Sequence, residues 1–180
     1  GEASVRLLAK HGARVIVASR KLDACELVAA DIREQGGDAV AMACHIGDLD
    51  QIQKLYAAID EKFGRLDILV NNAGALIRRE LVAEMAEATF DEVVALNFKS
   101  VFLCSQAAMP RLPDGTGRIV NISSVSANHY AGEGAALYSI SKAGVSRMTE
   151  ALAVEWSRNR INVNAIAPGA FRSEMMDGMM

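Results

Sequence analysis

The apolar positions of this 180-residue chain follow two spacings that alternate from one end to the other. Short continuous runs of aliphatic residues predict buried strands, whereas apolar residues at every third or fourth position predict amphipathic helices. Strands are expected at 14–18, 39–44, 66–70, 118–122 and 161–166. Helices are expected before Gly12, over 23–35, 49–63 and 89–109, and from the segment carrying Tyr138 to about Arg158.

This alternation of strand and helix is typical of a parallel sheet. Connections between parallel strands need a crossover, and strands that are apolar throughout are covered on both faces. We therefore expect an α/β fold with three layers, α/β/α. The length fits a single domain over residues 1–180.

Composition and charge narrow the class of protein. With 19 basic and 22 acidic residues, the chain has no electrostatic signature of nucleic-acid binding. The apolar stretches are too short to cross a membrane, and we expect no signal peptide because the first residues already form an amphipathic pattern. The histidines lack metal-ligand spacing, so we expect no metal. An odd number of cysteines without a CxxC pair favours a reducing, cytoplasmic location: Cys25, Cys44 and Cys104.

The most informative candidate chemistry is the stretch from Tyr138 to Lys142. The two residues are four positions apart in a predicted helix, so their side chains share one face. A nearby ammonium is expected to lower the pKa of a phenol from its ordinary value of about 10. Ser124 lies at the end of the strand predicted upstream. Such a set can exchange protons with an alcohol or a carbonyl oxygen.

Several further motifs occur in a characteristic order. An NNAG sequence at Asn71–Gly74 follows the third predicted strand, and Asn97 lies in the next helix. Ser124, the Tyr138–Lys142 pair and then Pro168 and Gly169 complete the series. A single YxxxK would be weak evidence, but five motifs on the expected elements are specific. Over essentially its whole length the chain resembles the short-chain dehydrogenase/reductase family, which implies a Rossmann-type doubly wound parallel sheet.

The resemblance implies a role for each motif residue. Tyr138 would pass a proton to or from the substrate oxygen, and Ser124 would hold that oxygen and stabilise developing charge. Lys142 would lower the pKa of Tyr138 and hydrogen-bond the nicotinamide ribose. Asn97 would anchor a water that links Lys142 to solvent. The cofactor would supply or accept the hydride.

Less specific interpretations exist for the same residues. Tyr138 and Lys142 would also be compatible with an ordinary exposed helix pair. Ser123 would be an alternative to Ser124, although Ser124 lies further towards the carboxyl end of the strand, where sites of α/β proteins form. Gly74 would fit a simple turn, but we favour a close approach of the backbone to the cofactor.

The segment after the first predicted strand bears on which nicotinamide is bound. It contains Arg20 and Lys21 and no acid before Asp23, which favours the 2′-phosphate of NADP(H) over NAD(H). The alternative is a solvated helix start. His45 stands where the family usually has an aspartate at the adenine. The resemblance implies cofactor contacts from Gly1, Ser19, Arg20, Lys21, His45, Ile46, Asn72, Ala73, Gly74, Tyr138, Lys142, Pro168, Gly169 and Ser173.

The family's first strand and most of its glycine-rich loop have no counterpart before Gly1, and its final strand has none before Met180. We therefore expect a fold incomplete at both ends, a fragment of a longer enzyme. Two strands of the sheet would then keep unpaired edges.

The predicted function is an oxidoreductase that interconverts a secondary alcohol and a ketone. Bacterial 3-oxoacyl thioester reductases and sugar-alcohol dehydrogenases resemble the chain equally. The pocket is expected at 75–79, at 126–134 and at the methionine-rich end, with Arg78 and Arg79 either receiving an acidic substrate or balanced by a neighbour such as Glu80. A homotetramer or homodimer is expected. The alternatives are a non-catalytic dinucleotide binder or an inactive truncated chain.

Overall fold

The computed structural model describes residues 1–130 and 132–170, and the chain divides into two compact units. One unit is Gly1–Ala58 and the other is Ile59–Met180; helix α3 (Leu49–Phe63) crosses the boundary between them. The expectation of a single domain over the whole chain stays a prediction, and each unit is described by itself.

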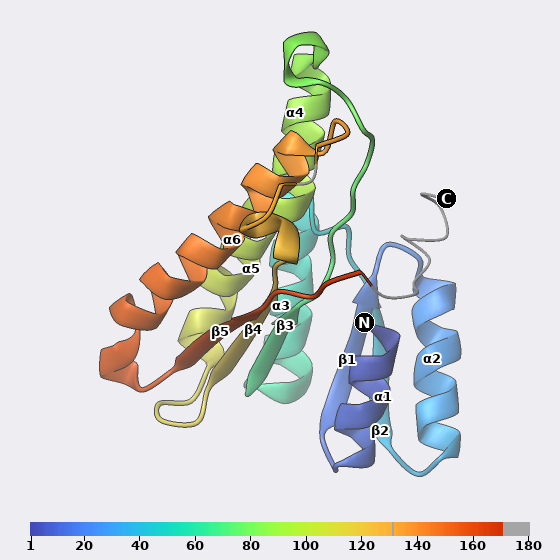
Figure 1. Ribbon diagram of the computed structural model, residues 1–180. Helices are drawn as coiled ribbons and strands as arrows, with labels where there is room; N and C mark the ends of the chain where they lie inside the picture. Colours follow the sequence, from blue (N-terminus) through green and yellow to red (C-terminus); the bar gives the residue numbers. More distant parts are fainter. Residues whose placement is uncertain (131, 171–180) are drawn as a thin grey trace. The chain divides into compact units, whose positions relative to one another are not determined.

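The first unit is a pair of parallel strands with two helices packed on it (Figure 1). In chain order its elements are α1 (Glu2–Lys10), β1 (Arg14–Ser19), α2 (Leu22–Glu34) and β2 (Asp38–Ala43). The two strands pair in parallel from Arg14 opposite Asp38 to Ser19 opposite Ala43. Small and β-branched side chains close the space between helices and strands: Ala9, Val15, Ala29, Ile32 and Ala39.

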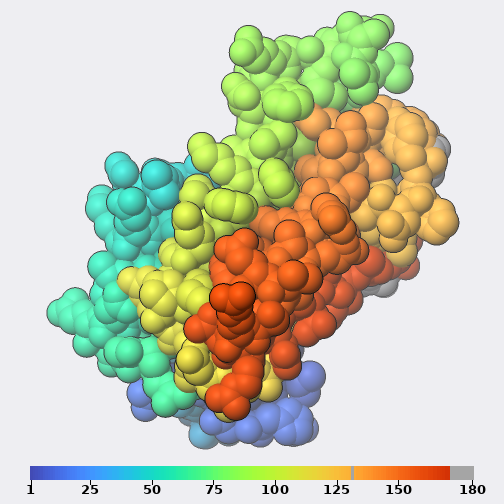
Figure 2. All heavy atoms as spheres, turned by 90° about the vertical axis from the view of Figure 1, so that its left-hand side faces the viewer, coloured from blue at the N-terminus to red at the C-terminus, as the bar shows by residue number. Residues whose placement is uncertain are grey.

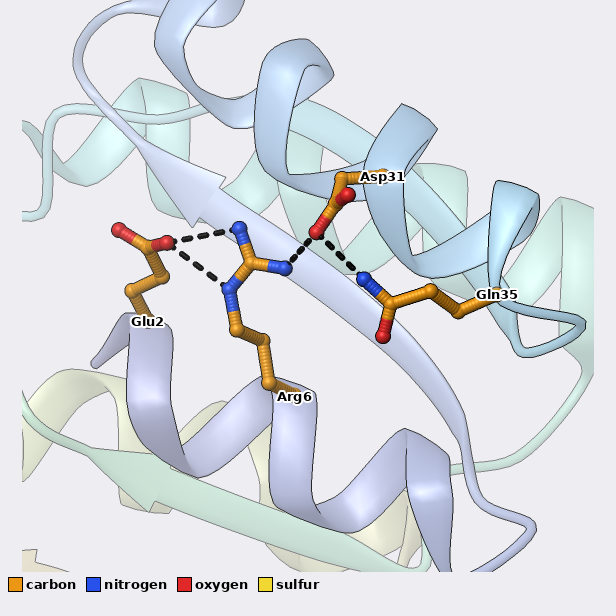
Figure 3. A network of polar contacts seen from close by, with 4 residues as sticks. All are labelled: Glu2, Arg6, Asp31 and Gln35. Carbon is orange, nitrogen blue, oxygen red and sulfur yellow. Dashed lines mark hydrogen bonds and ion pairs between the residues drawn. The ribbon is translucent and has the colours of Figure 1, made fainter.

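A polar network on the surface of the first unit joins its two helices (Figure 3). Arg6 of α1 donates to Glu2 one turn earlier (2.8 Å) and forms an ion pair with Asp31 of α2. Gln35 also donates to Asp31 (2.9 Å), and the hydrogen bond from Arg6 is the main cause that lowers the pKa of Asp31. The groups are partly exposed, so this network orients the helices more than it stabilises them.

The second unit is built on a three-stranded parallel sheet in the order β3 (Ile68–Asn71), β4 (Arg118–Ile122) and β5 (Asn162–Ile166). The longest helix, α6 (Ala136–Glu155), packs on β4 and β5 and lies along α4 (Figures 1 and 2). The other helical segments are η1 (Val82–Glu84), α4 (Glu87–Val94), η2 (Ala95–Lys99), α5 (Ser100–Ala108), η3 (Met109–Arg111), η4 (Val125–Ala127) and η5 (Ser157–Asn159).

A chain of buried amides and hydroxyls runs through this second unit. Asn71 of β3 donates to Ser105 of α5 (3.1 Å) and to Asn121 of β4 (2.9 Å). Asn121 in turn donates to Thr149 of α6 (2.9 Å). All four side chains are buried and hydrogen-bonded, so the network ties both helices to a single register of the sheet.

The α/β fold of Rossmann type with parallel strands is confirmed, and two expectations about its elements need correction. The helix expected over 89–109 is interrupted by a π-helical turn, Ala95–Lys99, where the Ser100 amide donates to Ala95 five residues back. The third strand begins at Ile68 rather than 66, because the Leu66 amide bonds to Arg111 instead of to a strand.

The strands form two separate sheets. Among residues 1–130 and 132–170, β1 pairs only with β2, and β3 pairs only with β4 on one side. Each therefore keeps one open edge, as expected from the sequence. Ile68 at the start of β3 remains 41% exposed, which is unusual for an apolar residue of a parallel strand.

Candidate active site

The carboxyl end of β4 carries the first candidate residue, Ser124. It is buried, has an extended backbone and accepts a hydrogen bond from the Ser126 amide (3.1 Å). The next amide, that of Val125, donates to the Pro168 oxygen (3.0 Å), which brings the segment after β5 beside the segment after β4. Two strand ends thus meet at one edge of the sheet, where parallel α/β proteins bind ligands.

Tyr138 lies in the first turn of α6, and its phenol shares a hydrogen bond with the Ser124 side chain. Burial raises the pKa of Tyr138, and the bond to Ser124 offsets only part of that effect. The tyrosine therefore holds its proton at neutral pH and can donate it.

Lys142 follows one helical turn after Tyr138 and is 3% exposed. Its Nζ donates to the main-chain oxygen of Ile122 on β4 (2.8 Å) and lies 5.8 Å from the centre of the Tyr138 ring. Burial lowers the pKa of Lys142 from 10.5 to about 8, because the ammonium loses water without gaining a carboxylate.

The expectation that Lys142 lowers the pKa of Tyr138 is wrong for this structure. The pKa of Tyr138 is raised, with burial as the largest cause and the hydrogen bond to Ser124 acting against it. The physical reason is the position of the ammonium, which is bound to the Ile122 oxygen and whose own charged form is disfavoured by burial.

Asn97 lies fully buried in the π-helical turn, and its side chain is committed to main-chain partners. Its Oδ1 accepts from the Ala75 amide (2.9 Å), and its Nδ2 donates to the Ala75 oxygen (2.9 Å) and to Val93 (3.2 Å). The amide therefore holds the segment after β3. The expected water-anchoring role of Asn97 stays a prediction, and the side-chain amide is already occupied.

Gly74 lies between Asn97 and Lys142. A methyl group in place of its hydrogen would lie 2.9 Å from the Asn97 Oδ1 and 3.0 Å from the Lys142 Nζ. Both separations are shorter than a van der Waals contact, so a side chain here would have to displace Asn97 or Lys142. The sequence indicated a close approach to a cofactor here; the structure adds a close approach to two of the candidate catalytic side chains.

The two neighbouring serines at the end of β4 have different surroundings. Ser123 is 3% exposed, and its hydroxyl is hydrogen-bonded to α6, at the Lys142 oxygen (2.9 Å) and at Ser146 (2.7 Å). The Ser124 hydroxyl instead reaches Tyr138. This geometry favours Ser124 over Ser123 as the residue that contacts substrate.

A contact between two loops lies beside the start of α6. Arg79 donates to the Glu133 carboxylate (3.0 Å) and to its main-chain oxygen (3.2 Å), and the Glu80 amide donates to Gly134 (2.9 Å). Sequence reasoning suggested Glu80 as the balancing acid and missed Glu133, which has a φ of 60°. Because the two are 54 residues apart, helical spacing could not have revealed the pair.

The remaining predicted cofactor residues of the first unit lie at the carboxyl edge of β1 and β2. Arg20 and Lys21 are exposed just after β1, and Lys21 precedes the first turn of α2. His45 follows β2, and its Nδ1 accepts from the Gly47 amide (3.1 Å). That bond leaves the other ring nitrogen, Nε2, to carry the proton of the neutral imidazole and to donate to a ligand.

The other sequence-predicted residues fall into three groups. Gly1 is exposed at the start of α1, Ser19 ends β1 with its hydroxyl 3.1 Å from the Cys25 sulfur, and Ile46 is half-buried. Asn72, Ala73 and Gly169 are exposed beside the second unit's site segments. Ser173 and the methionines at 175, 176, 179 and 180 lie outside the described residues.

No group of three or more potential metal ligands occurs within 1–130 and 132–170. No helix in the same part of the chain is long and apolar enough to cross a membrane. The three cysteines are buried and form no disulfide within the described residues, and burial is the main cause that raises the pKa of Cys44.

Comparisons with known proteins place these residues in context. A model of the short chain dehydrogenase family matches residues 1–179. A 3-oxoacyl-[acyl-carrier-protein] reductase of Synechocystis is 36% identical over 99% of this chain and 72% of its own length. Gluconate 5-dehydrogenase of Gluconobacter oxydans is 33% identical over 96% of this chain and 67% of its own length.

A solved structure agrees with this grouping. A short-chain dehydrogenase/reductase from Serratia marcescens superimposes with a TM-score of 0.92 at 35% identity, over 97% of this chain and 71% of that protein. Sequence, fold and the arrangement of the candidate site lead to the same conclusion: this chain belongs to the short-chain dehydrogenase family.

Proposed function

We propose that the chain is an NADP(H)-preferring oxidoreductase that interconverts a secondary alcohol and a ketone. The observation that carries this proposal is the hydrogen bond between Ser124 and Tyr138, with the Lys142 ammonium 5.8 Å from the same ring. A helix-borne phenol beside a strand-end hydroxyl offers two donors to one substrate oxygen.

The protein's part of the reaction is proton transfer and orientation. In the direction of reduction, Tyr138 gives its phenolic proton to the substrate oxygen, since its raised pKa keeps it protonated at neutral pH. Ser124 hydrogen-bonds the same oxygen as negative charge develops there. The Lys142 Nζ, which donates to the Ile122 oxygen, lies 5.8 Å from the centre of the same ring. A bound nicotinamide supplies the hydride chemistry.

The residues available fit such a cofactor. In the second unit, exposed Asn72 and Ala73 precede Gly74, where an added methyl group would lie 3.0 Å from the Lys142 Nζ. In the first unit, exposed Arg20 and Lys21 suit a 2′-phosphate, whose charge a guanidinium binds in a bidentate manner. The proton on Nε2 of His45 is suited to an acceptor nitrogen of adenine.

Two substrate classes agree with the relatives' names. One is a 3-oxoacyl thioester and the other is a sugar acid such as gluconate. Arg79 does not distinguish between these two substrate classes, because its guanidinium is already paired with Glu133. Both contain the same reacting unit, a secondary alcohol or its ketone.

The proposal is tested on the full-length natural protein that carries this sequence. NADPH oxidation with acetoacetyl-coenzyme A and NADP⁺ reduction with gluconate are measured in parallel, after fluorescence titration with NADPH and NADH. We expect NADPH to bind more tightly and one of the two substrates to turn over. Cofactor binding without turnover of either, or of a panel of simple ketones, would favour a non-catalytic binding protein. An absence of nucleotide binding would indicate an inactive chain.

We also propose a cytoplasmic homotetramer or homodimer. Exposed apolar side chains on α5 and α6, Phe102 (44%) and Ile140 (63%), support contacts between copies of the chain. The buried cysteines, which form no disulfide within the described residues, are compatible with a reducing compartment. Light scattering of the natural protein measures the number of subunits, and a monomer would contradict the proposal.

A further inference from the structure

Lys142 is held to strand β4 at two points. Its Nζ donates to the Ile122 oxygen (2.8 Å), and its main-chain oxygen accepts from the hydroxyl of Ser123, the next residue of the chain (2.9 Å). The same oxygen also accepts from the Ser146 hydroxyl of α6 (3.2 Å), but only Ser123 reaches it from the segment that ends β4. Consecutive residues at the strand end thus bind the two ends of one lysine.

The hydroxyl that makes the second contact is sequestered from solvent. Ser123 is 3% exposed, and its amide donates to the Ile166 oxygen of β5 (2.8 Å), which fixes its backbone in the sheet. Its hydroxyl also shares a hydrogen bond with Ser146 (2.7 Å), one turn further along α6. The single hydroxyl proton of Ser123 is therefore used on the Lys142 oxygen and is not available to donate to a substrate, but the residue is well placed to hold the helix.

The neighbouring turn of α6 is attached in a similar way. The Ser139 hydroxyl donates to the Ser126 oxygen in η4, next to Tyr138. The helix turns on which Tyr138 and Lys142 lie are thus both bonded to the segment that follows β4. Packing alone would leave the helix free to slide by fractions of an ångström, and proton transfer is sensitive to such displacements.

We propose that Ser123 is a positioning residue that holds Lys142 over the Tyr138 ring by bonding its main-chain oxygen, in contrast to its neighbour Ser124, which contacts the substrate. This inference rests on the proposed function. Without the Ser123 hydroxyl, the lysine turn is attached to β4 through its side chain alone. The Nζ then gains water, and its distance from the ring is no longer fixed.

The test compares Ser123→Ala with Ser146→Ala in the full-length natural protein. The Ser146 hydroxyl donates to the same Lys142 oxygen (3.2 Å) from within α6, so the control removes a bond inside the helix and keeps the bond that joins the helix to the end of β4. Lys142 is titrated by heteronuclear NMR, its signal being assigned by its loss in Lys142→Arg. The pKa of Lys142 is about 8 in the unmodified chain. It is expected to rise towards 10.5 in Ser123→Ala and to remain about 8 in Ser146→Ala.

Kinetics give the second readout. Ser123→Ala is expected to lower kcat about tenfold with little change in KM, because substrate binding does not involve this hydroxyl. Equal Lys142 titration and equal kcat in both variants would overturn the inference. If the unmodified protein turns over no substrate, the proposed function fails, and the Lys142 titration still decides whether Ser123 positions the lysine.

Discussion

The carboxyl ends of two strands, β4 and β1, carry candidate residues in opposite environments. After β4, Ser124 and Lys142 are buried and hydrogen-bonded. After β1, Arg20 and Lys21 are exposed. Proton transfer needs desolvated groups at set distances, whereas recognition of a phosphate needs charge that a ligand can reach. The comparison shows that the residues predicted to transfer protons are buried, whereas the residues predicted to bind the cofactor phosphate are exposed.

The largest expected effect is the loss of the phenol in Tyr138→Phe. The ring keeps its packing, but no proton donor remains beside Ser124, so kcat should fall by about 10²–10⁴-fold. Cofactor affinity, measured by fluorescence titration, should hardly change. Retained turnover would show that the residues at the carboxyl end of β4 do not transfer the proton. The ends of β4 and β1 would then no longer differ in their proposed roles.

The burial of Lys142 predicts how stability depends on pH. Its folded pKa of about 8 lies below the ordinary 10.5, so the unfolded chain binds more protons between these values and stability rises with pH there. The full shift corresponds to about 3 kcal/mol. Above about pH 10 the raised pKa of Tyr138 acts in the opposite direction, because the unfolded tyrosine loses its proton first.

Urea unfolding of Lys142→Met measures this effect. The variant should be more stable than the unmodified protein at neutral pH, and its unfolding free energy should no longer increase between pH 8 and 10. An unchanged pH dependence would mean that the ammonium is better hydrated than its 3% exposure indicates.

Gly74→Ala tests the close approach inside the site. The methyl group would lie 2.9 Å from Asn97 and 3.0 Å from the Lys142 Nζ. Overpacking of this kind costs about 1–3 kcal/mol of stability, and displacement of the lysine should also lower kcat. Thermal unfolding and kinetics together measure both effects. A variant as stable and as active as the parent would show that the segment after β3 can move enough to accommodate the methyl group.

Arg20→Ala is expected to have the smallest effect, and only on one cofactor. Loss of a charge-assisted hydrogen bond should weaken NADPH binding by about 10–100-fold and leave NADH binding unchanged. Lys10→Ala removes one positive charge from the same unit, at the exposed end of α1, and serves as the control. Equal weakening for both nucleotides would show that Arg20 acts as a general charge and does not select the phosphate.

Most strands and helices were predictable, because each depends on a local pattern. The spacing of Tyr138 and Lys142 placed them on one helical face, and the apolar run before Ser124 placed it at a strand end. The π-helical turn around Asn97 was not predictable, since a helix of either kind shows similar apolar periodicity over a few residues. The contact between Arg79 and Glu133 was not predictable either, because it joins two loops that are 54 residues apart in the sequence.

The sequence by itself determined the family, the parallel α/β architecture and which residue types can exchange protons. Only the tertiary structure decided their electrostatic state. The four-residue spacing places Lys142 near Tyr138, but burial lowers the pKa of Lys142 and raises that of Tyr138. The tertiary structure also separated Ser123 from Ser124, because adjacent residues at a strand end face opposite ways. Such properties depend on what surrounds a side chain, and residues far along the chain supply those surroundings.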